Sequence, residues 1–269
     1  MTGVELAGLL ALGAATGFLA GLFGIGGGMI LVPFLTLILT AHGAPAEHVV
    51  HIAIATSLAT ILFTSISSLR AHHRHGAVLW PVARALAPGI VVGAAAGAQV
   101  AALLPTAPLA AAFAGFVGLS ATQMLRNRKP KPSRQLPGAA GLASAGGLIG
   151  LVSSLVGAGG AFVSVPFMVW CNVAIHRAVG TASALGFPIA AAGTAGYVAA
   201  GWREFGAPAW PFAGFVYLPA LAAIVAMSVL TAPLGARLAH AIDAAPLRRG
   251  FALLLYLLAG YMLFKAISA

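Results

Sequence analysis

The sequence predicts an all-α integral membrane protein made of two similar halves, and three observations predict it. First, 61% of the 269 residues are hydrophobic and 7% are charged, whereas an ordinary soluble domain has about 25% charged residues. Second, the apolar residues form long runs, and a membrane-spanning helix needs about 20 of them. Third, one glycine-rich signature occurs in each half. A soluble enzyme fold is excluded, because too few polar residues are present to cover its surface.

The apolar runs are the expected helices. In chain order they cover residues 5–23, 29–40, 48–69, 77–103, 106–125, 139–156, 162–172, 175–199, 210–236 and 247–267. We expect helices because lipid offers no water partner to backbone groups, and because a β-barrel would show alternating strands of about ten residues. Residues 1–5 lack the basic start of a signal peptide, so the first run is assigned to the mature protein.

A basic segment divides the chain. Residues 126–137 read RNRKPKPSRQLP, and the three prolines and five cations of this stretch exclude a buried helix. We therefore expect a first half over residues 1–125, a cytoplasmic loop over 126–137 and a second half over 138–269.

The two halves repeat a signature. Leu22–Leu35 reads LFGIGGGMILVPFL and Leu155–Met168 reads LVGAGGAFVSVPFM, with seven of fourteen positions identical. Similar composition explains a shared valine, but it does not explain glycines and a proline in one register. Farther along, Ala55–Ser57 corresponds to Gly180–Ala182. Internal duplication of this kind is typical of secondary transporters.

The paired signature resembles the sulfite exporter TauE/SafE family of bacterial inner-membrane proteins. A helix, then G-x-G-G, then a short apolar segment with V-P-F occurs twice, and the resemblance covers nearly the whole chain. The family implies transport of small sulfur-containing or organic anions, such as sulfite, sulfonates and related carboxylates. It fixes neither the anion nor the direction of transport.

The glycine-rich breaks are the candidate substrate-binding segments. Each glycine costs about 1 kcal/mol in a helix interior, so a continuous helix is improbable at either break. The helix that begins after a break has free N–H groups with partial positive charge, which attract anions. The candidate glycines are Gly24, Gly26, Gly27 and Gly28 in the first half and Gly157, Gly159 and Gly160 in the second. We assign Gly89, Gly93 and Gly97 instead to close helix packing.

Hydroxyl side chains complete the candidate site. Thr56, Ser57, Thr181 and Ser183 lie well inside apolar helices of the two halves. Such a hydroxyl either bonds to its own helix or points toward a ligand, and both readings stay open. Gln99 and Asn172 are weaker candidates.

The sequence gives little support for a proton relay, a metal site or a disulfide. Four carboxylates, at Glu5, Glu47, Glu204 and Asp243, lie near segment ends, so a carboxylate proton relay inside the membrane is not expected. His51 is the strongest candidate for a titrating group. His72, His73 and His75 fit a solvated basic loop better than a metal site. The single Cys171 excludes an internal disulfide and a cysteine-based metal site. No cofactor is expected.

The net charge of +10 reflects cations between apolar segments, which favours contact with lipid headgroups over nucleic-acid binding.

Two membrane topologies remain possible. If each broken segment crosses once, eight spans follow, ten of fourteen Lys and Arg share one side, and both termini are cytoplasmic. If each folds back as a hairpin, three full spans follow per half and the second half is inverted. Twelve cations then share one side, with only Arg203 and Lys265 outside.

The positive-inside rule favours the hairpin, the inverted repeat and exterior termini. The length of residues 5–23, about 28 Å as a helix, favours a full crossing.

These observations predict a multi-pass transporter in the inner (plasma) membrane, not an enzyme. We expect alternating access around a site near the bilayer midplane, where the glycine-rich breaks bind a small anion. H⁺ or Na⁺ is the expected coupling ion, and a homo-oligomer is left open. An anion channel and a carrier of small carboxylates are the alternatives. An intramembrane enzyme or a haem subunit would need catalytic or ligating side chains that these spans lack.

Overall fold

The computed structural model describes residues 3–23, 27–126, 134–206, 210–241 and 245–268. These residues form ten helices and one pair of short strands. In chain order the elements are α1 (Gly3–Phe23), α2 (Gly28–Ala41), α3 (Val49–Arg74), α4 (Trp80–Leu103), α5 (Thr106–Arg126), α6 (Ala139–Leu155), α7 (Ala161–Trp170), α8 (Ile175–Phe205), β1 (Phe212–Ala213), β2 (Val216–Tyr217), α9 (Leu218–Ala241) and α10 (Ala245–Ser268).

The all-α membrane architecture is confirmed. Seven of the described helices are long and apolar enough to cross a membrane, namely α1, α3, α4, α5, α8, α9 and α10. The helices α2, α6 and α7 are shorter, with 10 to 17 residues each. The expected helix over 210–236 begins only at Leu218, because residues 212–217 form an antiparallel strand pair that turns at Gly214, where φ is +58°.

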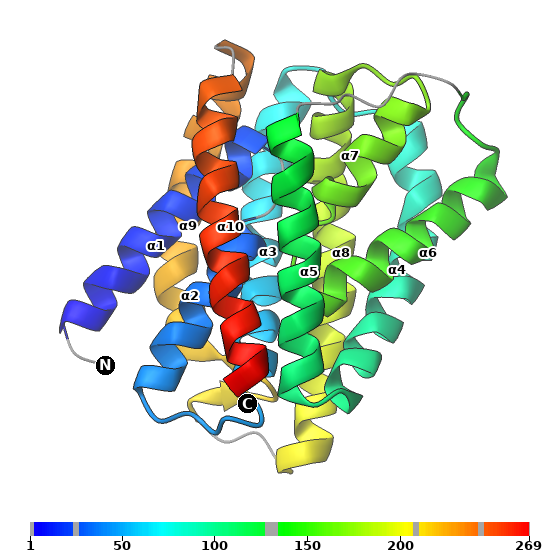
Figure 1. Ribbon diagram of the computed structural model, residues 1–269. Coiled ribbons are helices and arrows are strands. Elements are labelled where there is room, and N and C mark those ends of the chain that lie inside the picture. The colour runs from blue at the N-terminus through cyan, green and yellow to red at the C-terminus, as the bar shows by residue number, and fades with distance from the viewer. Residues whose placement is uncertain (1–2, 24–26, 127–133, 207–209, 242–244, 269) are drawn as a thin grey trace.

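Each glycine-broken segment folds back on itself (Figure 1). In the first half, His42 follows α2, and its Nε2 lies 2.7 Å from the Oε1 of Glu5, at the start of α1. In the second half, Arg134 precedes α6, and its guanidinium lies 4.8 Å from the ring centre of Trp170, the last residue of α7. The two helices of each segment therefore begin and end at the same side of the molecule.

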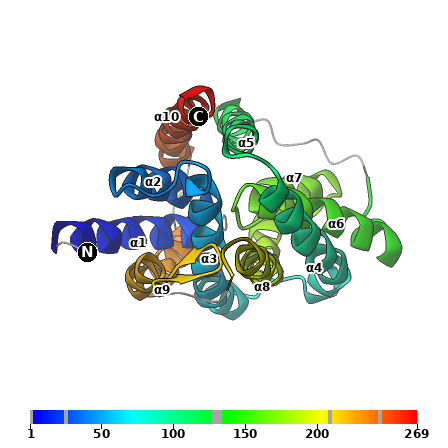
Figure 2. The same cartoon turned by 90° about the horizontal axis from the view of Figure 1, so that it is seen from below.

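The antiparallel helices α3 and α8 lie side by side at the centre of the molecule (Figure 2). The other helices pair around them, with α1 along α9, α4 along α6 and α5 along α10. Tyr217, directly before α9, contacts α3, and Leu79, directly before α4, contacts α8. The inverted relation between the halves stays a prediction.

Close packing of the α4–α6 and α1–α9 pairs depends on glycine, as expected for Gly89, Gly93 and Gly97. A Cβ atom on Gly89 would collide with the carbonyl oxygen of Ala143, and one on Gly93 with that of Gly147, both in α6. The α1–α9 pair is built likewise, because a Cβ on Gly21 would collide with the backbone of Ala232. The helix backbones are therefore in direct contact in both the α4–α6 pair and the α1–α9 pair.

The two ends of the molecule differ in charge. Both chain termini lie at one end (Figure 1), which we call the terminal end. Glu5 lies there beside His42, and His48 lies 3.9 Å from Glu204. The opposite end, where α3 and α5 finish and α8 begins, carries Arg74, Arg126 and Arg177, and we call it the basic end.

Candidate functional site

The two glycine-rich breaks have matching backbone geometry where a new helix begins. Gly27 caps α2 with φ 76° and ψ −9°, and Gly160 caps α7 with φ 78° and ψ −11°. Both are left-handed conformations that side chains other than glycine rarely adopt. Local backbone geometry therefore explains why glycine occurs at both positions. Gly24 and Gly26 lie outside the described residues.

The break of each half approaches the other half. Gly28, the first residue of α2, lies against Gly157, and a Cβ on Gly28 would collide with the carbonyl oxygen of Gly157. The hydroxyl of Ser57, from α3, donates a hydrogen bond of 3.0 Å to that same oxygen. Three residues expected in the site thus meet between α2, α3 and the α6–α7 break.

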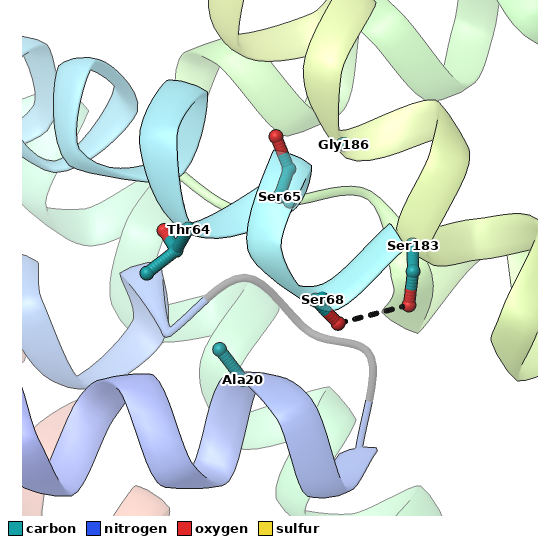
Figure 3. Close-up of a pocket in the computed structure, with 7 residues that line it drawn as sticks. Ala20, Thr64, Ser65, Ser68, Ser183 and Gly186 are labelled. Carbon is teal, nitrogen blue, oxygen red and sulfur yellow. Dashed lines mark hydrogen bonds between the residues drawn. The ribbon is translucent and has the colours of Figure 1, made fainter. Parts of the chain in front are cut away.

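A hydroxyl-lined pocket lies between α1, α3, α8 and the second glycine-rich break (Figure 3). It is narrow, with room for about one water molecule. Its lining consists of Ala20 from α1; Thr64, Ser65 and Ser68 from α3; Gly159 from the second break; and Ser183 and Gly186 from α8. Gly159 and Ser183 were expected in the site. Ser68 and Ser183 face each other, with 3.4 Å between their Oγ atoms.

The residues that line the pocket are all neutral. Its four hydroxyl residues are Thr64, Ser65, Ser68 and Ser183. A hydroxyl both donates and accepts hydrogen bonds and rotates to suit its partner. Thr64 and Ser183 now donate to Thr60 and Val179, in their own helices. Because the space is about that of one water molecule, a larger ligand requires the pocket to widen.

The sequence reasoning did not identify Thr64, Ser65 and Ser68. A signal was present, since Thr56, Thr60, Thr64 and Ser68 recur every four residues and so lie on one face of α3. All four are at least 96% buried. Thr60 and Thr64 bond within α3, whereas Ser68 reaches Ser183 in α8, so the stripe marks the polar face of α3 that meets the pocket.

Thr56 and Thr181 lie outside the pocket lining. Each hydroxyl binds the backbone of the residue directly before another helix. The Oγ1 of Thr56 accepts a 3.0 Å hydrogen bond from the N–H of Tyr217, directly before α9. The Oγ1 of Thr181 accepts a 2.9 Å bond from the N–H of Leu79, directly before α4. Their similar placement therefore has a structural explanation.

The remaining candidates take separate partners. The Nε2 of His51 lies 3.1 Å from the carbonyl oxygen of Ala101, at the terminal end. Gln99 accepts a hydrogen bond from Arg203, whereas Asn172 ends α7 in a turn with φ 64°.

The histidines near the basic end also point to different groups. The Nε2 of His72 lies 3.2 Å from the carbonyl oxygen of Gly21, whereas His73 accepts a hydrogen bond from Trp80.

Comparisons with known proteins agree on one family. The family model described as sulfite exporter TauE/SafE matches residues 9–262. A "probable membrane transporter protein" of Haemophilus influenzae is 36% identical over 258 residues, which covers 95% of this chain and 97% of that protein. The "probable membrane transporter protein YdhB" of Bacillus subtilis is 27% identical, covering 70% of this chain and 77% of its own length. No solved structure matches the chain.

Proposed function

Because the chain belongs to the sulfite exporter TauE/SafE family, we propose that it is a secondary transporter that binds small anions, of the sulfite or sulfonate kind, in the hydroxyl-lined pocket. Family and relatives make the chain a multi-pass membrane transporter rather than an enzyme. The observation that carries the anion proposal is the facing pair Ser68 and Ser183 beside the glycine-rich break.

The lining favours a weakly held anion that is released again. Hydroxyl and backbone donors stabilise an anion without the deep electrostatic well of a buried cation. Gly159 has no side chain, so it lines the pocket with backbone alone. Alternating access between the two halves, driven by a gradient of H⁺, Na⁺ or substrate, completes the proposed mechanism.

The test is binding and transport with purified protein. We expect sulfite or a sulfonate to raise the melting temperature and to enter proteoliposomes with saturable kinetics. Sulfate, thiosulfate and small carboxylates are the comparison anions, and Na⁺ and pH gradients are varied separately. Saturation only by a carboxylate would contradict the sulfur-anion assignment. Unsaturated conductive flux would show a channel and contradict the carrier.

The pocket assignment has its own variants. Ser68→Ala and Ser183→Ala each remove a donor to the charged ligand, which is worth about 1.5–3 kcal/mol, so the substrate Kd should rise roughly tenfold or more. Ser120→Ala is the matched control, because this buried serine bonds Phe116 in its own helix α5. Unchanged affinity in both pocket variants would remove the pocket from the proposal.

A further inference from the structure

The interface between α3 and α8 changes from polar to apolar along its length. The two helices pair in antiparallel register, with Ser68 facing Ser183 at 3.4 Å. Closer to the terminal end, a Cβ on Gly186 would lie 3.1 Å from the Cβ of Ser65. Farther still, a Cβ on Gly193 would lie 3.0 Å from Cδ1 of Leu58. The hydroxyl-lined pocket therefore occupies the half of this interface nearer the basic end.

An apolar plug, formed by Leu58, Ile61 and Ile189, lies between the pocket and the terminal end. All three side chains are fully buried. Ile61 approaches Gly186 of the pocket lining, where a Cβ would be 4.0 Å away. Ile189 covers Gly160, since a Cβ there would collide with its Cδ1. These three side chains offer a hydrated anion no polar partner in exchange for its water, so they oppose its passage, although the hydroxyl of Ser153 lies beside Gly160.

An aromatic layer around Phe215 lies beyond the plug, at the terminal end. The ring of Phe215 lies 5.4 Å from that of His51, 5.2 Å from Phe205 and 6.4 Å from Tyr197, between ring centres. Phe215 is only 2% exposed. Tyr197 is fully buried and donates a 3.2 Å hydrogen bond to the carbonyl oxygen of Ser154, in α6. This end is thus closed by two successive layers.

The corresponding place at the basic end has a much smaller side chain. Phe215 lies two residues before Tyr217, whose N–H is bound by Thr56. Ala77 lies two residues before Leu79, whose N–H is bound by Thr181. The residue two positions before the bound N–H is therefore a phenylalanine at one end and an alanine at the other. This difference in size favours closure at the terminal end.

We propose that the apolar plug and Phe215 form a gate that closes the pocket toward the terminal end, and that the pocket opens toward the basic end. This inference rests on the proposed function, since the gate matters for transport only if the pocket is the substrate site. Transport to the other side then requires Leu58, Ile61 and Ile189 to separate as the halves move.

Thiol labelling from each side of the membrane tests the gate without any substrate. Cys171→Ser removes the native thiol, which is buried, and Ser65→Cys places a new thiol in the pocket. The probe is a membrane-impermeant, cationic methanethiosulfonate reagent applied to either face of oriented vesicles. We expect labelling roughly tenfold faster from the basic end, because a minor open state is usually populated at 10% or less. Equal or faster labelling from the terminal end overturns the gate.

Two further variants locate the barrier. A thiol at Leu58→Cys should stay unlabelled from both faces, and labelling from the terminal end contradicts the plug. Phe215→Ala combined with Ile189→Ala should make Ser65→Cys reactive from both faces, and persistent one-sided labelling counts against these residues. Val92→Ala is the matched control, since Val92 is 72% exposed on α4 and should leave the labelling pattern unchanged.

The outcomes separate this inference from the proposed function. One-sided labelling without transport of any tested anion keeps the gate and rejects the anion assignment. Saturable anion transport with equal labelling from both faces rejects the gate and keeps the anion assignment.

Discussion

Single glycines determine how closely neighbouring helices approach in this chain. At Gly93 the backbone of α4 touches that of Gly147 in α6, so any side chain pushes the helices apart. At Gly27 and Gly160 the requirement is a left-handed φ instead. Ser68 and Ser183 show a third effect at the scale of residues. Neither hydroxyl is unusual by itself, and only their position opposite each other indicates a site. The sequence alone identified the glycines, because their chemistry is local, but it missed Ser68.

Gly93→Ala should lower stability, because overpacking of a tight interface costs about 1–3 kcal/mol. Gly115→Ala is the control, since a Cβ there meets nothing within 4 Å. In α5 the added alanine should be neutral or stabilising by up to about 1 kcal/mol. Thermal unfolding of the purified variants in detergent measures both effects. Equal melting temperatures for the two variants would contradict the packing role.

At the scale of elements, the folded-back segments are the main feature. A continuous helix from residue 5 would have passed through the bilayer, whereas the ion pair of Glu5 with His42 holds the end of α2 beside the start of α1. The predicted runs gave the helices correctly except before Leu218, where a strand pair replaces the expected helix start, since long apolar segments leave little choice in lipid. They did not give the direction of α2, because that depends on contacts between residues far apart along the chain.

The Glu5–His42 pair should make the end of the first hairpin sensitive to pH. The hydrogen bond that His42 donates to the Glu5 carboxylate raises the pKa of His42 above its ordinary value, which is about 6.5. A raised pKa in the folded state means that the stabilisation is complete below pH 6.5 and disappears as pH rises through the raised pKa. NMR titration of His42 measures this shift. Glu5→Gln should return the pKa toward its ordinary value, and an unchanged titration curve would contradict the pairing.

At the scale of the whole molecule, charge predicts orientation. The basic end carries most of the described cations, whereas Arg203 and Lys265 belong to the ends of α8 and α10 nearest the chain termini. The positive-inside rule therefore places the basic end in the cytoplasm and both termini outside. With this orientation, the proposed gate faces the exterior and the pocket faces the cytoplasm.

Reporter fusions test this orientation. Alkaline phosphatase fused after Ala269 should be active, and green fluorescent protein at the same place should be dark, because only the phosphatase matures outside the cytoplasm. Fusions within residues 126–137 are the internal control and should give the reverse. Cytoplasmic activity after Ala269 would reject the assigned orientation.

The sequence by itself determined the membrane class, the ten helical segments, the duplicated glycine signature and the family resemblance. These features depend on composition and on residues close together in the chain, which lipid and backbone geometry constrain strongly. Only the tertiary structure decided that the broken segments fold back, that Ser57 bonds Gly157, and that Ser68 faces Ser183 in a pocket also lined by Thr64 and Ser65. The register between α3 and α8 is set by side-chain packing between distant segments, and no local pattern encodes that packing.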